Sequence, residues 1–198
     1  MRPEPYEPFG RDTPSDGRDE MAADAARGRP KRQAQGEDDP ESFARQILLR
    51  RLTDRPRSRA ELAEALAKGD VPGDVATAVL DRFEEVGLID DEEFARTWVQ
   101  SRQRSRGLAG RLLAQELRRK GIDDELIRDT VGEIDPESEE QAARRLVQKR
   151  LRSLRKVDDA KKTQRLVGML ARKGYSPGLA YKVVRDEIGA DAEAFESL

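Results

Sequence analysis

The stretch LIDDEEFARTWVQSRQRSRG, residues 88–107, decides the fold class, because it contains the start, the packed face and the end of one helix. Asp90 or Asp91 provides the N-cap, since a carboxylate accepts hydrogen bonds from the free amides of a first helical turn. Phe94 and Trp98 lie one turn apart and therefore form an apolar stripe on one helix face. Arginines follow this stripe, and a glycine ends the stretch. The pattern predicts an amphipathic helix with a packed beginning and a basic end.

Composition limits the kinds of site that the chain can form. The 198 residues include no cysteine and no histidine, which removes disulfides, thiolate metal ligands and the commonest general base. Carboxylates remain, so enzyme function is disfavoured, and we expect neither a catalytic site nor a metal nor a cofactor. No run of about 18 apolar residues occurs and the N-terminus has no apolar signal segment, so we expect a cytoplasmic protein without a membrane span.

The N-terminal part of the chain differs in composition from the remainder. Residues 1–41 contain no Leu, Ile or Val and hold six of the ten prolines. Such a segment cannot bury enough apolar surface to offset the conformational entropy lost on ordering. We therefore predict a disordered tail over residues 1–41. The basic run RGRPKR, residues 27–32, is interpreted as a solvated part of this tail rather than as a nucleic-acid contact.

From Ser42 onward the pattern is helical, with no alternating run that indicates a strand. Ser58-Arg59-Ala60-Glu61 is a capping box, and Gly69 is expected to take the left-handed position after the helix that follows. Asp135-Pro136 and Ser176-Pro177 each combine an N-cap residue with proline at the first helical position. One apolar helix face is predicted from Val75, Val79, Phe83 and Val86.

The helical part contains three copies of one unit. The pair Ala-Arg recurs at 44–45, 95–96 and 143–144, and a Lys-Gly pair follows in each copy at 68–69, 120–121 and 173–174. We therefore predict an all-α fold of three tandem three-helix repeats, in an elongated array whose curvature the sequence leaves open. The predicted repeats span residues 42–89, 90–135 and 136–189, and residues 190–198 form the C-terminal end. Such arrays present long surfaces rather than deep pockets, which favours binding over catalysis.

Basic residues are concentrated in the second and third repeats. Residues 95–121 hold eight Lys and Arg against the single acid Glu116, and residues 143–173 hold twelve against Asp158 and Asp159. A solvated helix usually interleaves both signs, so this excess favours a polyanionic or acidic partner. Arginine suits bidentate contacts with phosphate or carboxylate groups.

The apolar stripe of residues 88–107 is interpreted as the seam between the first and second repeats rather than as a base-stacking platform. Arg102 and Arg106 continue the same helix and are expected to lie outside the core. Reversing the charges of Arg102, Arg104 and Arg106 together is therefore expected to weaken partner binding while the thermal midpoint stays nearly unchanged.

The same residues carry a family resemblance. Residues 88–107, followed by LAQELRRKGI at 113–122, resemble the signature of the RecX family, the regulators of the RecA recombinase. ARRLVQKRLRSLRKVDDAKKTQRLVGMLARKGYS, residues 143–176, is similar to the basic third repeat of that family, with Tyr175 at its aromatic position. The resemblance covers about residues 42–189, and the family fold is tandem three-helix repeats. Its structural motif comprises Leu88, Ile89, Asp90, Asp91, Phe94, Trp98, Gly121 and Gly174.

The resemblance implies a monomeric, non-enzymatic modulator of RecA. Such a protein binds the RecA filament on single-stranded DNA along its groove, contacts the DNA weakly or through RecA, and reduces strand exchange and ATP hydrolysis. Its setting is recombination, DNA repair and the SOS response. We expect the basic faces to contact acidic filament surface or DNA phosphates through Arg96, Arg102, Arg104, Arg106, Arg111, Arg118, Lys149, Arg150, Arg152, Arg155, Lys156 and Arg165.

Three alternatives stay open. A helix-turn-helix-like protein would bind duplex DNA directly, although Gln100 and Gln103 are the only close candidates for base readout beside the arginines of the second repeat. A phosphate-handling enzyme is suggested by Gly107-Leu108-Ala109-Gly110, which we interpret instead as a helix–helix turn, and no GxxxxGK[ST] loop occurs. A generic helical adaptor for another protein differs only in its partner.

Overall fold

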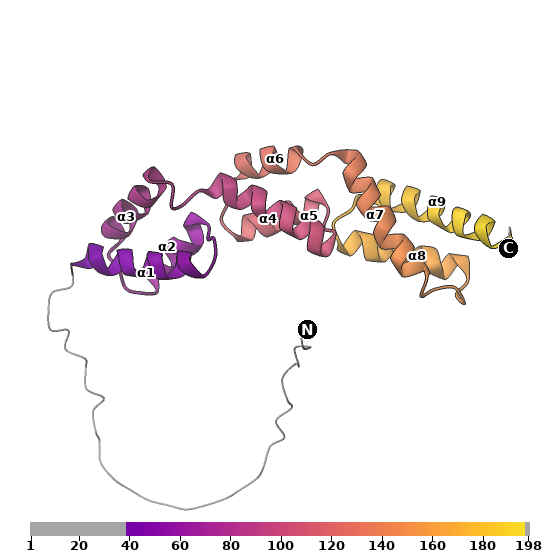
Figure 1. The fold of residues 1–198 in the computed structure, drawn as a ribbon, viewed down its shortest axis with the longest axis horizontal. Helices are drawn as coiled ribbons and strands as arrows, with labels where there is room; N and C mark the ends of the chain where they lie inside the picture. The colour runs from indigo at the N-terminus through magenta and orange to yellow at the C-terminus, as the bar shows by residue number, and fades with distance from the viewer. Residues whose placement is uncertain (1–38, 197–198) are drawn as a thin grey trace, which may run out of the picture. The chain divides into compact units, whose positions relative to one another are not determined.

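The structure is a computed structural model that describes residues 39–196, with side chains to residue 191. This range contains nine α-helices and no strand, and helix packing is concentrated within three consecutive groups of three (Figure 1). The helices are α1 (Pro40–Asp54), α2 (Arg59–Ala67), α3 (Gly73–Glu85), α4 (Asp91–Arg106), α5 (Gly110–Arg119), α6 (Asp124–Gly132), α7 (Pro136–Leu151), α8 (Asp159–Arg172) and α9 (Pro177–Glu196). We call α1–α3 bundle 1, α4–α6 bundle 2 and α7–α9 bundle 3. The predicted all-α fold of three-helix repeats is confirmed.

Helix α1 begins slightly earlier than the start predicted at residue 42. Asp39 is its N-cap and accepts a hydrogen bond from the Glu41 amide at 3.4 Å. Pro40 occupies the first turn, where its fixed φ suits a helix and its missing N–H costs nothing. Residues 39–41 therefore belong to the cap and first turn rather than to the predicted tail. The other residues of that prediction, 1–38, lie outside the described residues.

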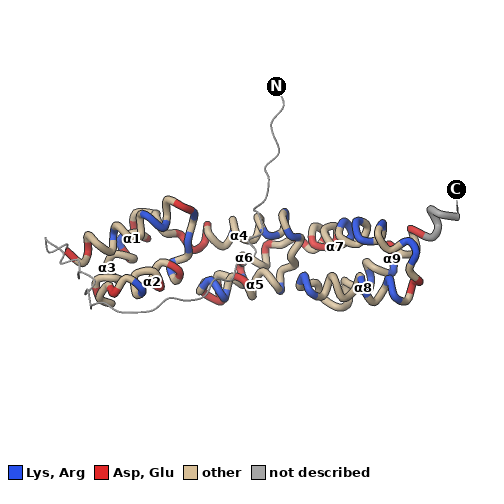
Figure 2. Tube along the Cα trace, turned by 90° about the horizontal axis from the view of Figure 1, so that it is seen from below, with Lys and Arg blue, Asp and Glu red and all other residues tan. Residues whose placement is uncertain are grey.

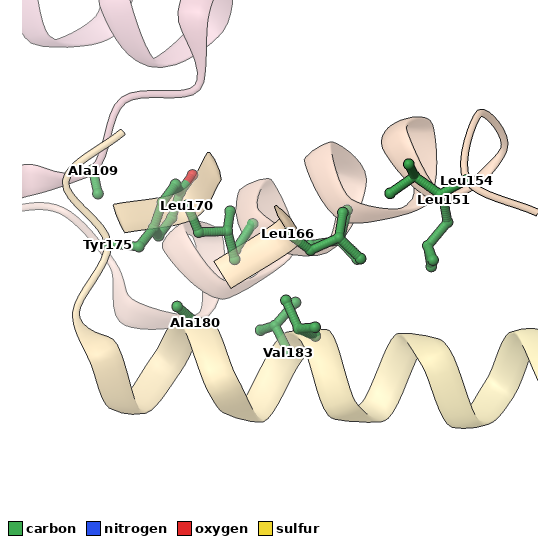
Figure 3. Close-up of a cluster of buried hydrophobic side chains, with 11 residues drawn as sticks. Ala109, Leu151, Leu154, Leu166, Leu170, Tyr175, Ala180 and Val183 are labelled. Carbon is green, nitrogen blue, oxygen red and sulfur yellow. The ribbon is translucent and has the colours of Figure 1, made fainter. Parts of the chain in front are cut away.

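Each bundle has its own apolar core. The most deeply buried large side chains are Leu48, Leu62 and Leu66 in bundle 1, Leu113, Leu117 and Ile127 in bundle 2, and Val147, Leu166, Leu170, Val183 and Val184 in bundle 3. Figure 3 shows the bundle 3 core, where side chains of α7, α8 and α9 meet. Burying one such side chain contributes about 1.5–3 kcal/mol. The helical spacing of these residues therefore explains why each repeat closes on itself.

The apolar face predicted for α3 is correct in its centre and wrong at its end. Val79 and Phe83 are buried, but Val86 is 54% exposed. Helix α3 ends at Glu85 and Gly87 turns the chain with φ 71°, so the Val86 side chain no longer follows the buried face. The chain then returns to bundle 1, where Ile89 is buried in its core.

The left-handed position after α2 is occupied by Asp70 rather than by the predicted Gly69. Asp70 has φ 56°, and the residue after it, Val71, donates its amide to Leu66 O at 3.2 Å as a Schellman turn requires. The corresponding turns after α5 and α8 place Gly121 and Gly174 at this position. The turn after α2 is therefore one residue longer than the Lys-Gly pairing of the three copies suggests.

Helix α9 extends beyond the predicted end of the third repeat at residue 189. It runs to Glu196, because Gly189 is followed by alanines and acidic residues rather than by a helix-breaking turn. A single glycine costs a helix only about 1 kcal/mol. Most of the predicted C-terminal end, residues 190–198, is therefore helical, and residues 197 and 198 lie outside the described residues.

Bundles 1 and 2 meet where the turn after α5 lies against the start of α2. The Ser58 hydroxyl donates to Lys120 O at 2.6 Å, and Ser58 is fully buried. Gly121, with φ 72°, lies so close to Ala60 that a Cβ atom on this glycine would be 2.3 Å from the Ala60 Cβ. The junction therefore requires the hydroxyl of Ser58 in bundle 1 and a glycine at position 121 in bundle 2.

Bundles 2 and 3 repeat this arrangement. The turn after α8 lies against the start of α5, where the Ala109 amide donates to Lys173 O at 2.9 Å. Gly174 has φ 92°, and a Cβ atom there would be 2.7 Å from the Leu112 Cβ. Ala109 belongs to the core of bundle 3, and Figure 3 shows it beside Tyr175. This junction is thus more apolar than the first.

A second contact recurs at both junctions. The first amide of α2, on Arg59, donates to Asp91 Oδ1 at 2.8 Å, and the first amide of α5, on Gly110, donates to Glu139 Oε1 at 2.8 Å. Each acid comes from the first helix of the following bundle, so one repeat caps the second helix of the repeat before it. Burial raises the pKa of Asp91, while the hydrogen bond from Arg59 opposes that rise. Asp90, not Asp91, is the N-cap of α4.

Replacing Ser58 by alanine is expected to lower the free energy of unfolding by about 2 kcal/mol, because the cap of α2 is lost and Lys120 O loses its partner at the junction. Chemical denaturation monitored by circular dichroism measures this change. Ser101→Ala is the matched control, because Ser101 is exposed on α4. Equal stabilities of the two variants would contradict the structural role of Ser58.

Candidate functional site

Trp98 packs against the core of bundle 2 on the side that faces bundle 1, a region that we call the seam. Its ring is stacked with Phe94 at a centroid distance of 5.7 Å, and its indole N–H donates to Glu116 Oε2 at 2.9 Å. The residue also lines a cleft of about 400 Å³ together with Leu52 and Pro56 from bundle 1. The stripe therefore packs mainly in the core of bundle 2, and only its outer side lines the cleft toward bundle 1.

Arg102 lies outside the apolar core, as predicted, but its side chain is only 26% exposed because it folds back over Trp98. Its guanidinium lies over the Trp98 ring at 4.1 Å from the centroid, and its Nε is 3.3 Å from Glu116 Oε2. Lys120 Nζ lies 4.9 Å from the same ring centroid. Cation–π contacts of this kind stabilise by about 0.5–2 kcal/mol. The sequence signal for this arrangement was Glu116, the only acid in a basic stretch. Its carboxylate accepts a hydrogen bond from Trp98 and pairs with Arg102, so it holds both side chains together.

Most of the other basic residues predicted in bundle 2 also have acidic partners. The pairs are Arg96 with Glu92, Arg106 with Glu116 at 3.9 Å, and Arg118 with Asp124 at 2.7 Å. Exposed pairs contribute little to stability, but they neutralise the surface. Arg104 and Arg111 are exposed and have no ion-pair partner in the part of the chain that the structure describes. Bundle 2 therefore presents less free positive charge than the sequence suggested.

The unpaired positive charge of bundle 3 is concentrated at the end of α7 and in the connection to α8. We define the basic cluster as Lys149, Arg150, Arg152, Arg155 and Lys156, at the end of α7 and in the α7–α8 connection. All five are exposed, and none has an ion-pair partner within residues 39–191. Figure 2 shows α7 changing from acidic at its start to basic at its end. Arg165 on α8 is likewise exposed and without a charged partner in this range.

The basic cluster is attached to a rigid core. Leu151 and Leu154 alternate with the cluster residues and are 5% and 3% exposed, and Leu154 donates its amide to Leu151 O at 2.7 Å. The apolar side chains point into bundle 3 (Figure 3) and hold the connecting segment, so the basic side chains are directed outward. Unpaired guanidinium groups that project from a backbone held in this way are suited to bidentate contacts with phosphate or carboxylate groups.

Other basic residues of bundle 3 serve its internal packing. Arg144 joins α7 to α9 through Glu187 at 3.1 Å, and it also pairs with Glu140 of its own helix at 2.6 Å. Hydrogen bonds from Lys182 and Arg144 lower the pKa of Glu140. Tyr175, 3% exposed, donates its hydroxyl to Gly107 O at 3.2 Å, and burial raises its pKa to about 12. These residues connect helices and bundles.

The alternative chemistries receive no support from the geometry. Gly107-Leu108-Ala109-Gly110 is the turn between α4 and α5, and the amides of Ala109 and Gly110 are already bonded to bundle 3. Within the described residues, no cluster of acidic side chains is arranged to hold a metal ion. None of the helices in that range is long and apolar enough to cross a membrane.

Comparison with known proteins identifies the family. Three family models match in order: the first RecX three-helix domain over residues 44–83, the second over 90–131 and the third over 137–184. The chain is 49% identical to "Regulatory protein RecX" of Streptomyces coelicolor over 183 residues, covering 92% of this chain and 94% of that protein. It is 48% identical to the protein of the same name from Thermobifida fusca over 172 residues, which cover 87% of this chain and 92% of that protein.

Solved structures agree with this relationship. The crystal structure of RecX from Lactobacillus salivarius shares the fold with a TM-score of 0.70 at 19% identity, covering 75% of this chain and 97% of that one. A second crystal structure of regulatory protein RecX gives a TM-score of 0.67 at 26% identity, and the match covers 75% of this chain and 73% of that one. With three domain matches in sequence order and close relatives over nearly the whole length, this chain belongs to the RecX family of regulatory proteins.

Proposed function

We propose that this chain regulates the RecA recombinase by binding the RecA filament on single-stranded DNA along its groove. The bound chain reduces strand exchange and ATP hydrolysis without catalysing a reaction itself, and so regulates recombination, DNA repair and the SOS response. The observation that carries the proposal is the match of all three repeats to the RecX domains, in order.

The basic cluster of bundle 3 is the part of the molecule best suited to the filament contact. Its five side chains are exposed and unpaired within the described residues, whereas most of the basic residues of bundle 2 are engaged with acids or with Trp98. We therefore assign the main electrostatic contact to the cluster, with Arg104, Arg111 and Arg165 as additional contacts. Arg96, Arg102, Arg106 and Arg118 become secondary candidates.

Reversing three charges of the cluster, in Arg150→Glu/Arg152→Glu/Arg155→Glu, is expected to raise the concentration needed for half-inhibition of RecA by about ten-fold or more. A ten-fold change corresponds to about 1.4 kcal/mol of binding free energy. The measurement is the single-stranded-DNA-dependent ATPase of RecA, titrated with the full chain at near-physiological salt. The thermal midpoint should stay nearly unchanged, because exposed substitutions usually alter stability by only about 0.5 kcal/mol.

The matched control carries the same change in charge elsewhere. Arg45→Glu/Arg82→Glu/Arg185→Glu reverses three exposed arginines whose ion pairs are local, and its inhibition should resemble that of the wild type. Binding of the wild-type chain to naked single-stranded and duplex DNA is measured in parallel. If RecA is unaffected while duplex DNA is bound tightly with sequence preference, the helix-turn-helix alternative replaces the proposal.

A further inference from the structure

A third basic stretch lies in bundle 1, outside the surface considered above. RRLTDRPRSR, residues 50–59, holds five arginines and one acid, Asp54. It forms the end of α1 and the connection to α2. Arg50, Arg51 and Arg55 are exposed and have no ion-pair partner among residues 39–191. The function proposed above does not use them.

These arginines line a series of neighbouring clefts. A cleft of about 420 Å³ between α1 and α2 is lined in part by Arg50, Arg51 and Lys68. A smaller cleft of about 120 Å³ shares Arg51 and Lys68 with it and extends to Arg57. Arg57 also lines the cleft of about 400 Å³ at the seam with bundle 2. Because each cleft shares lining residues with the next, the three are neighbours along α1, α2 and the seam, and we call them together the trough.

The seam end of the trough is apolar. Leu52, Pro56, Leu88 and Trp98 line it, and Leu88 is 51% exposed although it belongs to the motif that identifies the family resemblance. Ile89, the next residue, is buried in bundle 1 and fixes the position of Leu88. An exposed leucine at the edge of an apolar cleft is typical of a binding surface.

Two observations favour a protein segment over a nucleic acid strand as the occupant. The Trp98 ring already contacts Phe94, Arg102 and Lys120, which leaves little open ring face for a nucleobase. Leu52, Pro56 and Leu88 line the same cleft and suit a bulky apolar side chain, whereas a sugar–phosphate strand has no aliphatic group of that kind to fill it.

The unpaired arginines complement carboxylates. Arg51 lies in the part of the trough next to the seam cleft, and Arg55 lines the seam cleft itself. Four acids that line the clefts are engaged. Glu61 accepts from Lys120 at 2.6 Å and Glu64 pairs with Lys68 at 2.5 Å. Asp90 accepts from the Glu93 amide at 2.9 Å, and Glu93 accepts from the Thr97 hydroxyl at 3.0 Å. A guanidinium–carboxylate pair that forms beside an apolar anchor is the usual arrangement at the centre of a protein interface.

We propose that this trough docks an acidic peptide segment of a partner protein. A bulky apolar side chain of the segment enters the seam cleft between Leu88, Pro56 and Trp98, and flanking carboxylates bind Arg51 and Arg55. This inference is independent of filament binding, because it concerns a different surface and is tested without RecA.

The test uses the full chain and a labelled peptide of about twelve residues, with a central Leu-Phe pair between glutamates and aspartates, a length typical of extended segments that dock in grooves. Fluorescence anisotropy measures binding, and the emission of Trp98, the only tryptophan of the chain, reports occupancy of the seam cleft. The variants are Arg51→Glu/Arg55→Glu and Leu88→Asp. The control, Arg45→Glu/Arg82→Glu, reverses two arginines of bundle 1 that do not line the three clefts.

We expect saturable binding that changes the Trp98 emission and weakens about ten-fold in each trough variant, with the control within about two-fold of the wild type. A peptide with lysines in place of its acids should not bind. Absence of binding by the acidic peptide, or binding that the two variants leave unchanged, would overturn the inference. An oligothymidylate strand is tested as a competitor. If this strand displaces the peptide, and if its own binding is lost in Arg51→Glu/Arg55→Glu, the trough binds nucleic acid instead.

Discussion

Gly174→Ala is expected to lower the free energy of unfolding by about 3 kcal/mol. Gly174 has φ 92°, where a residue with a Cβ atom is strained by about 1–2 kcal/mol. The added Cβ would also lie 2.7 Å from the Leu112 Cβ and 2.8 Å from the Leu112 backbone nitrogen. A backbone atom cannot move aside as a flexible side chain can, so the junction between bundles 2 and 3 must open.

The measurement is chemical denaturation of the full chain, followed by helical content. Gly178→Ala is the matched control, because Gly178 lies in the first turn of α9 with no atom within 4 Å of an added Cβ. Alanine there should leave stability unchanged or raise it by up to about 1 kcal/mol. Two variants with the same denaturation midpoint would show that the close approach of Gly174 to α5 does not exist in solution.

Arg102→Glu is expected to destabilise the protein by about 3 kcal/mol, although the residue belongs to a stretch that resembles a solvent-facing basic helix. The substitution removes the guanidinium from the Trp98 ring and places a carboxylate beside Glu116, whose side chain is only 18% exposed. Loss of the cation–π contact costs about 1 kcal/mol, and a like-charged, partly buried pair adds about 2 kcal/mol.

Arg104→Glu separates this effect from a simple change of charge. Arg104 lies on the same helix, two positions further on, but it is exposed and unpaired within the described part of the chain. The thermal midpoint of the Arg104→Glu variant should match that of the wild type. The emission of Trp98 should shift in the Arg102 variant and not in the Arg104 variant, since Arg102 covers the ring and Arg104 does not contact it. Unchanged stability of Arg102→Glu would restore the interpretation of Arg102 as a solvent-facing contact residue.

This pair of variants also affects how partner-binding experiments are interpreted. A triple reversal of Arg102, Arg104 and Arg106 combines one structural residue with two exposed ones. Loss of binding by that triple variant would therefore not distinguish a broken interface from a disturbed seam. Reversals within the basic cluster of bundle 3 avoid this problem, because those side chains have no structural partner among the described residues.

The sequence by itself determined the fold class, the number of repeats and the starts of four helices of this protein. These properties depend on local chemistry, which a sequence displays directly. Ser58, Asp90, Asp135 and Ser176 cap their helices as predicted, because a cap involves residues only two or three positions apart. The buried leucines of each bundle follow from helical spacing in the same way.

Only the tertiary structure decided which basic residues are free. A count of charges along the chain treats Arg102 and Arg150 alike, but Glu116 on a neighbouring helix engages the first and no acid within residues 39–191 engages the second. The same holds for Asp91, which resembles a cap for its own helix yet bonds to the amide of Arg59 in the preceding bundle. Contacts between residues distant in sequence depend on how the bundles pack, and the helical period of a single segment contains no information about that packing.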